Sequence, residues 1–152
     1  QGAGTEEKAK LSHPDWYASE PGSYFTVDST LFAGYAQASN GDSLKSHQMA
    51  QKQARANLEA GLSAYFEDRR KDFLETNPSS KSVDENEFKF ILRNVSEKIS
   101  REAEIVEAQV NQQENRHIGY CKTQISSQKV EEILSETFAN QGKYLSIIQS
   151  WN

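Results

Sequence analysis

Residues 104–126 read EIVEAQVNQQENRHIGYCKTQIS, and hydrophobic side chains recur in this stretch with a period of two. Such alternation is typical of a strand that turns one face to a core. Pairing Val106 with Tyr120 puts the apolar residues of both halves on one face and leaves a loop of about five residues, 111–115. The stretch therefore predicts an antiparallel hairpin.

A second alternating stretch, TLFAGYAQA at residues 30–38, predicts another strand earlier in the chain. Phe32, Gly34 and Ala36 would share one face of it. Leu31, Ala33 and Tyr35 would share the other. The small residues of this stretch indicate that a helix packs closely against the strand.

Two long stretches between these strands carry hydrophobic residues at helical spacing. The first runs from Ser43 to about Thr76, and Asp42 stands where an N-cap belongs. Its apolar stripe is Ala50, Ala54, Leu58, Leu62, Tyr65 and Phe73. The second begins after a capping box at residues 82–85. Its stripe is Phe88, Ile91, Leu92, Val95 and Ile99. A third, shorter helix would be capped by Ser127.

The order β-α-α-β-β-α predicts an α+β domain in which a small antiparallel sheet packs against two long helices and one shorter helix. We expect residues 1–13 to be a flexible leader and residues 14–152 to form a single domain, with residues 143–152 as a possible extra strand. A helix of about 33 residues is about 50 Å long, whereas a strand of about eight residues spans about 27 Å. The first helix should therefore bend or extend past the sheet, where the second helix would cover it.

Composition excludes some classes of function. The 152 residues carry a net charge of −5, and no face is expected to collect Lys and Arg, so binding to nucleic acid or to an anionic membrane surface is not expected. Cys121 is the single cysteine, which excludes an intramolecular disulfide. No apolar run approaches the length of a membrane span.

Gly41-Asp42-Ser43-Leu44 matches the signature of a family of serine esterases. In that family the block follows a buried strand of a parallel, doubly wound sheet, and a His three residues after an Asp lies near the C-terminus. Here the block follows the polar residues 37–40, and no β-α-β alternation surrounds it. We expect this turn to cap a helix, and catalysis at Ser43 is the less favoured alternative.

No other residues suggest catalysis, a metal or a cofactor. His117 and Cys121 would lie about 13 Å apart along one strand, whereas two ligands of one zinc ion must each lie within about 2.3 Å of it. His13, Asp15 and His47 have no evident third partner. We therefore expect a non-catalytic protein without a cofactor.

Aromatic residues are the better candidates for a binding role, because Trp and Tyr dominate the energetics of protein interfaces. Five form a possible interaction surface: Trp16, Tyr17, Tyr65, Phe73 and Trp151. The alternative is that the terminal rings are lids over the core, and the residues alone leave both interpretations open.

Five motifs occur in a recognisable order: PDWY at 14–17, FAGYA at 32–36, MAQKQARANLEAGL at 49–62, EIVEAQV at 104–110 and HIGYCKTQIS at 117–126. Together they resemble the bacterial envelope lipoproteins typified by the twenty-kilodalton lipoprotein antigen. That group includes flagellum-associated outer-membrane lipoproteins. The resemblance covers about residues 14 to 138, and Tyr35 stands where the family usually has a smaller residue.

The resemblance implies a non-catalytic domain that faces the periplasm and is held at the outer membrane by a lipidated N-terminal Cys, which this chain does not contain. Residues 1–12 would suit a tether between lipid and domain. The partner would be a second copy or another envelope protein. The alternative is a periplasmic binder of a small molecule or a peptidoglycan fragment, in the space between the helical hairpin and the N-terminal arm.

Overall fold

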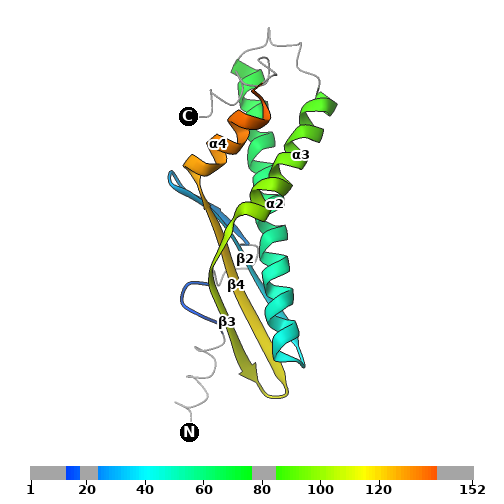
Figure 1. Ribbon diagram of the computed structural model, residues 1–152, viewed down its shortest axis with the longest axis vertical. Helices are drawn as coiled ribbons and strands as arrows, with labels where there is room; N and C mark the ends of the chain where they lie inside the picture. The colour runs from blue at the N-terminus through cyan, green and yellow to red at the C-terminus, as the bar shows by residue number, and fades with distance from the viewer. Residues whose placement is uncertain (1–12, 18–23, 77–84, 140–152) are drawn as a thin grey trace.

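A computed structural model describes residues 13–17, 24–76 and 85–139. The predicted α+β fold is confirmed, since these residues form an antiparallel sheet with helices packed against it (Figure 1). The sheet has the strand order β1-β2-β4-β3. The strands are β1 (Phe25–Val27), β2 (Leu31–Asn40), β3 (Glu104–Gln113) and β4 (Arg116–Ser126). The helices are α2 (Ser43–Thr76), α3 (Glu85–Glu102) and α4 (Ser127–Thr137).

The sheet has one more strand than the predicted order contains. β1 pairs with β2 so that Phe25 is opposite Gly34 and Val27 is opposite Phe32. Three residues are too few to show a period of two, which is why sequence patterning missed β1. The ring of Phe25 lies against Gly61 of α2, at a place that a Cβ atom on Gly61 would occupy.

The predicted register of the β3–β4 hairpin is wrong by three positions. Gln109, and not Val106, is opposite Tyr120, and the loop has two residues because Gln113 pairs with Arg116. Glu114, the first loop residue, has a φ of 55°, as the first central residue of a type II′ turn requires. Since side chains alternate along a strand, this odd shift puts Tyr120 and Ala108 on opposite faces of the sheet.

The register prediction failed because β4 is buried on both faces. Cys121 packs against α2, and Tyr120 packs on the other face against the N-terminal arm, residues 13–17. An apolar pattern fixes the register when one face of a sheet is buried. Here both faces of β4 carry buried apolar residues, so the pattern is compatible with more than one register. A bulge at Val106 adds a further irregularity, because Ile105 and Glu107 pair with the adjacent residues Thr123 and Lys122.

The structure confirms the prediction that α2 packs closely against the sheet. Ala36 of β2 packs with Ala50 and Ala54 of α2. A Cβ atom on Gly34 would stand 2.5 Å from the carbonyl oxygen of Ala54, and one on Gly119 would overlap the backbone at Ser46. Glycine at both positions therefore lets the helix lie directly on the strands.

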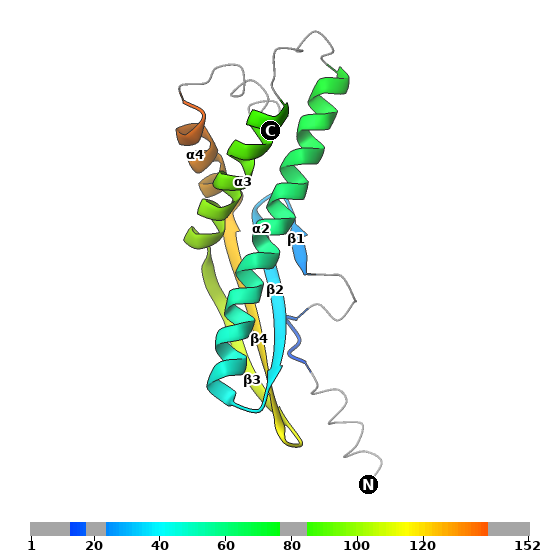
Figure 2. The same ribbon diagram turned by 90° about the vertical axis from the view of Figure 1, so that its right-hand side faces the viewer.

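α2 extends past the end of the sheet, α3 packs against its upper part, and α4 packs against α3 and β4 (Figures 1 and 2). The main core lies between these helices and the sheet, and includes Phe66, Phe88 and Phe138 together with Phe32 of β2 and Ile125 of β4. Arg55 of α2 holds the junction between α3 and β3. Its Nη1 donates to the carbonyl oxygens of Ser100 (2.7 Å) and Ala103 (2.8 Å). These bonds satisfy carbonyls that the end of α3 leaves free.

The cap of α4 is Ser126, one residue before the predicted Ser127. The hydroxyl of Ser126 accepts a hydrogen bond from the backbone N–H of Lys129 at 3.1 Å. Ser126 keeps the extended backbone of β4 (φ −71°, ψ 149°), and an N-cap is the last residue before helical geometry begins. The expected capping box at 82–85 falls largely outside the described residues, as do the leader to residue 12 and the tail 143–152.

Candidate interaction surface

β3 forms an edge of the sheet in the part of the chain that the structure describes (Figure 1). It is ten residues long, and none of them is buried. An edge strand presents a row of unpaired backbone N–H and C=O groups, which can pair with a strand from another chain. Its length makes β3 the clearest candidate for a binding surface.

The register identifies which backbone groups of β3 point outward. In a hairpin with a two-residue loop, the residues that flank the loop, Gln113 and Arg116, bond to each other. The alternate residues Ala108, Val110 and Gln112 then direct their N–H and C=O groups away from β4. Among the described residues no strand pairs with the six backbone groups of these three residues.

Hydrogen bonds on β2 support this assignment. Hydrogen-bonded and non-hydrogen-bonded positions alternate along β4 as well, and this alternation fixes the bonding of its other neighbour, β2. It places the backbone N–H and C=O groups of Tyr35 on the side of β2 away from β4. Its N–H donates to the carbonyl of Tyr24 at 2.9 Å, and its C=O accepts from Nδ2 of Asn57 at 2.7 Å. The outer edge of β2 is therefore satisfied at this point within the chain, whereas the described residues add no strand to β3.

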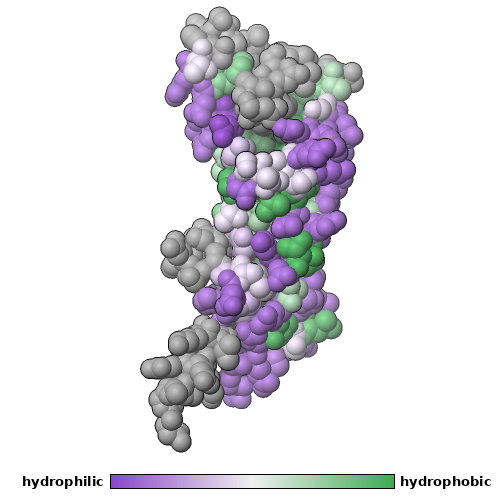
Figure 3. Space-filling model, turned by 90° about the vertical axis from the view of Figure 1, so that its left-hand side faces the viewer, coloured by the Kyte–Doolittle hydropathy of each residue, from purple (hydrophilic) through white to green (hydrophobic). Residues whose placement is uncertain are grey.

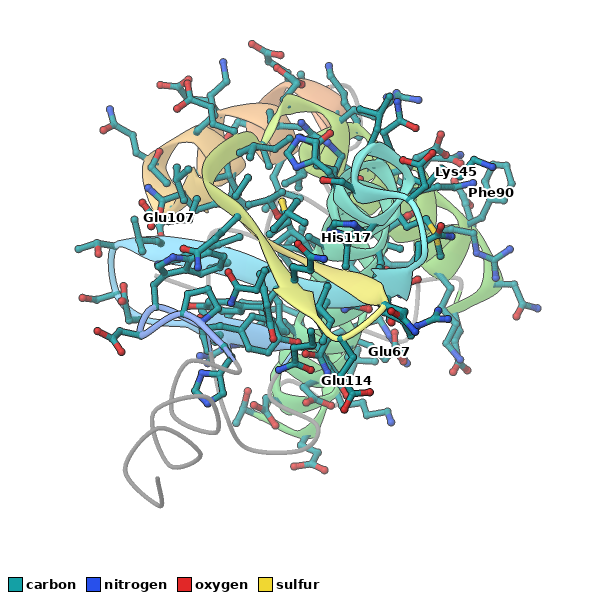
Figure 4. The ribbon with its side chains drawn as sticks, turned by 90° about the horizontal axis from the view of Figure 1, so that it is seen from below. Lys45, Glu67, Phe90, Glu107, Glu114 and His117 are labelled. Carbon is teal, nitrogen blue, oxygen red and sulfur yellow. The ribbon has the colours of Figure 1, made fainter. Side chains whose placement is uncertain are left out.

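Side chains on the face of β3 opposite α2 are polar. Gln109 and Asn111 lie on this face, and Nε2 of Gln109 donates to Oδ1 of Asn111 at 2.7 Å. Glu107, two residues earlier, lies at the outside of the molecule (Figure 4). Hydrophilic and hydrophobic residues are interspersed on the side of the molecule shown in Figure 3. Hydrogen bonding would therefore dominate recognition at this edge.

The N-terminal arm lies on the sheet as a lid. Tyr17 is 7% exposed, and its ring centroid lies 5.1 Å from that of Tyr120 and 6.4 Å from that of Tyr35. Burial raises the pKa of Tyr17 to about 12. Trp16 is half-buried beside it, at 6.3 Å in an edge-to-face arrangement. In this position the Tyr17 ring contacts the domain itself.

The five predicted interaction residues do not form one surface. Tyr65 is half-buried and meets Phe32 edge-to-face at 5.2 Å, and Phe73 also packs against the main core. Both lie in a hydrophobic cluster separate from that of Trp16 and Tyr17. Trp151 lies outside the described residues.

Ser43 begins α2 beside a sheet whose strand pairs are all antiparallel. The Gly-Asp-Ser-Leu esterases carry their serine on a parallel, doubly wound sheet, so the scaffold differs from theirs. The Asp42 carboxylate accepts hydrogen bonds from the backbone N–H of Leu44 (2.8 Å) and of Lys45 (3.2 Å). This confirms the predicted N-cap.

The cap gives a prediction with a neighbouring control. Asp42→Ala should lower the free energy of unfolding by about 1 kcal/mol, because two amides at the start of α2 lose their acceptor. Ser43→Ala should change it by less than about 0.5 kcal/mol, since the Ser43 side chain is exposed. Urea unfolding of both variants measures this. Equal losses would contradict the assignment of the cap, and ester turnover that Ser43→Ala abolishes would restore the hydrolase alternative.

Cys121 lies fully buried beneath α2, and this burial raises the pKa of its thiol to about 11. A thiol in that environment is a poor nucleophile at neutral pH. Within the described ranges, no group of three or more His, Cys, Asp or Glu residues is arranged to hold a metal ion. None of the helices described there is both long enough and apolar enough to cross a membrane.

Comparison with protein families and with curated proteins finds no family model that matches the chain and no similar curated sequence. The case for a site therefore depends on geometry. The edge position of β3 was not among the features expected from the sequence, although EIVEAQVNQQ carries a signal for it. Polar residues occupy both faces of this strand, Gln109 and Asn111 on one and Gln112 on the other, as expected for a strand without a neighbour on one side.

Proposed function

We propose that this chain is a non-catalytic protein-interaction domain of the bacterial cell envelope, held at the periplasmic side of the outer membrane by a lipid anchor. It binds other protein chains by adding a strand to β3. The observation that carries the proposal is the row of outward backbone groups on Ala108, Val110 and Gln112.

Two further observations support a binding role for this edge. The segment from Glu107 to Gln113 pairs regularly with β4 after the bulge, so its backbone is already extended as a partner strand requires. Arg55 fixes the preceding junction through two hydrogen bonds to carbonyls. A preorganised edge loses little conformational entropy when a partner strand binds.

The location rests on the resemblance to the envelope lipoproteins, which covers about residues 14 to 138 and includes the PDWY motif at 14–17 and the stretch HIGYCKTQIS at 117–126. A lipid anchor and a flagellum-associated assembly belong to the same proposal. The coding sequence upstream of Gln1 tests the location directly. A signal peptide that ends in a lipidation Cys supports it, and a cytosolic start contradicts it.

The described residues give less support to the alternative of a small-molecule binder. A shallow groove between α2 and α3, lined in part by Ser63, Lys89 and Arg93, has a volume of about 200 Å³. Sites that enclose drug-sized ligands usually measure roughly 300–1,000 Å³. The groove also lies away from the space between the helical hairpin and the arm where that alternative places its ligand.

Site-specific photo-crosslinking in the native cells tests the proposed edge. A photoreactive phenylalanine at Gln109 should give covalent adducts that fractionate with the outer membrane. The matched control is the same residue at Phe90, which is exposed on α3 and lies at the periphery of the molecule (Figure 4).

Adducts from position 109 that are absent from position 90 support binding at β3, once mass spectrometry has located the crosslink. If position 109 gives no adduct, or the two positions give the same adducts, the edge is not the binding surface.

A further inference from the structure

We infer that the strand added to β3 is β3 of a second copy of this chain, related to the first by a twofold axis at Val110. This inference rests on the proposed function, because it names the partner of the same edge. It gives an eight-stranded sheet that is continuous across the two chains.

Hydrogen bonding selects this register. Two antiparallel edges bond through residues whose backbone groups point outward, which on β3 are Ala108, Val110 and Gln112. With the axis at Val110, Val110 is opposite its own copy and Ala108 is opposite Gln112 of the second copy. All three outward residues of each chain are then paired. A shift by two residues in either direction leaves one outward residue of each chain without such a partner.

The bulge at Val106 limits how far a second β3 can pair toward the N-terminal end of the strand. Beyond Glu107 the strand loses its regular alternation, because Ile105 and Glu107 pair with adjacent residues of β4. The regular segment therefore begins at Glu107, one residue before Ala108, the first residue whose backbone groups point outward. Bulges commonly end pairing along an edge, and this one confines a second β3 to the residues around the axis.

Side chains are also self-complementary in this register. On the face opposite α2, Gln109 is opposite Asn111 of the second copy, and Glu107 is opposite Gln113 of the second copy. Amides both donate and accept hydrogen bonds, so each of these cross-strand pairs can be satisfied. On the other face the two Val110 side chains meet at the axis.

Charge would otherwise oppose a dimer of a chain with a net charge of −5. The register avoids contact between like charges at the interface, since no Glu of β3 is opposite another Glu. Lys122 is the neighbour of Glu107 within the same chain. Across the interface, four side chains follow one another on neighbouring strands: Lys122 and Glu107 of one copy, then Gln113 and Arg116 of the second copy. The negative Glu107 therefore lies between the positive Lys122 and the neutral Gln113.

Analytical ultracentrifugation with charge variants tests the inference. The unaltered chain should show a reversible monomer–dimer equilibrium. Replacing both Gln109 and Asn111 by Glu should weaken the dimer by about tenfold or more, because like charges then face each other at two symmetric pairs. Replacing both by Lys should do the same. Mixing the acidic and basic variants should restore a heterodimer, since each Glu then faces a Lys.

Both double variants change side chains that are exposed or half-exposed in the single chain. Both variants also remove the Gln109–Asn111 hydrogen bond within the chain. Circular dichroism and the urea midpoint of each variant, compared with those of the parent, therefore separate loss of the dimer from loss of the fold. An acidic variant that dimerises as tightly as the parent, or a mixture of variants that stays monomeric, would overturn the inference.

Cysteine crosslinking tests the register. Gln109→Cys protein mixed with Asn111→Cys protein should form an intermolecular disulfide rapidly, because directly opposite residues of a non-hydrogen-bonded pair have Cα atoms about 4.5 Å apart. Glu107→Cys mixed with Asn111→Cys is the control, since these positions are opposite only if the register slips by two residues. Faster crosslinking in the control mixture would show that the axis is not at Val110. The native Cys121 need not be replaced in these variants, because it is fully buried and its thiol is not accessible for crosslinking.

The two proposals fail differently. A parent chain that is monomeric at every concentration, together with a crosslink from position 109 to a different protein in cells, would overturn the dimer and leave binding at β3 intact. A monomeric chain with no crosslink from position 109 would overturn both. Crosslinks between two copies, together with the reversible dimer, support both.

Discussion

Gly34→Ala should lower the free energy of unfolding by about 3 kcal/mol. The added Cβ atom would stand 2.5 Å from the carbonyl oxygen of Ala54 and 2.7 Å from Cβ of Leu58. Neither atom belongs to the flexible end of a side chain, so α2 itself must move away from β2. That movement would also open the contacts of Ala50 and Ala54 with the sheet. Urea unfolding followed by circular dichroism measures the loss.

Gly41→Ala is the matched control, because nothing lies within 4 Å of the position of its Cβ atom. It should unfold at the parent's urea midpoint or slightly above it, since alanine restricts the unfolded chain more than glycine does. If Gly34→Ala were as stable as Gly41→Ala, the close approach of α2 to the sheet would be refuted. The α2 layer would then have to stand farther from β2.

Phe88→Ala should cost about 3–5 kcal/mol, the usual range for removing a fully buried ring. Phe88 has no exposed surface. Its ring stacks on that of Phe138 with centroids 5.9 Å apart, so it links α3 to the end of α4. Thermal or urea unfolding of the variant measures the cost.

Phe90→Ala is the control on the same helix. Phe90 is 62% exposed, and removing its ring should change the free energy of unfolding by less than about 0.5 kcal/mol. Two identical substitutions two residues apart thus test which side of α3 faces the core. Similar costs for both would mean that the helix is rotated from the orientation described above.

Several elements were predictable because the signal for each is local. Asp42 and the stripe from Ala50 to Leu62 predicted the start and the buried face of α2, and both are confirmed. The stripe from Phe88 to Ile99 predicted α3 in the same way. A helix closes its hydrogen bonds within its own segment, so its period and caps lie in consecutive residues.

The candidate binding edge was not predictable, because an edge is defined by the sheet's strand order, in which β3 comes last among the described residues. The hairpin was expected in a register that put Val106 opposite Tyr120, whereas Gln109 takes that place. Which β3 residues point outward follows from this pairing. A one-sided sheet was assumed, and the N-terminal arm instead covers the second face at Tyr17.

The amino-acid sequence by itself determined the long helices, the existence of the hairpin and the small residues at 34 and 36 that admit α2. Each depends on side chains within a few positions of one another. Only the tertiary structure decided the register, the short strand β1 and the edge position of β3, because these depend on contacts between segments far apart in the chain. Tyr120 and Cys121 are adjacent apolar residues, and it is the burial of both faces by α2 and the arm that decides which way each one points.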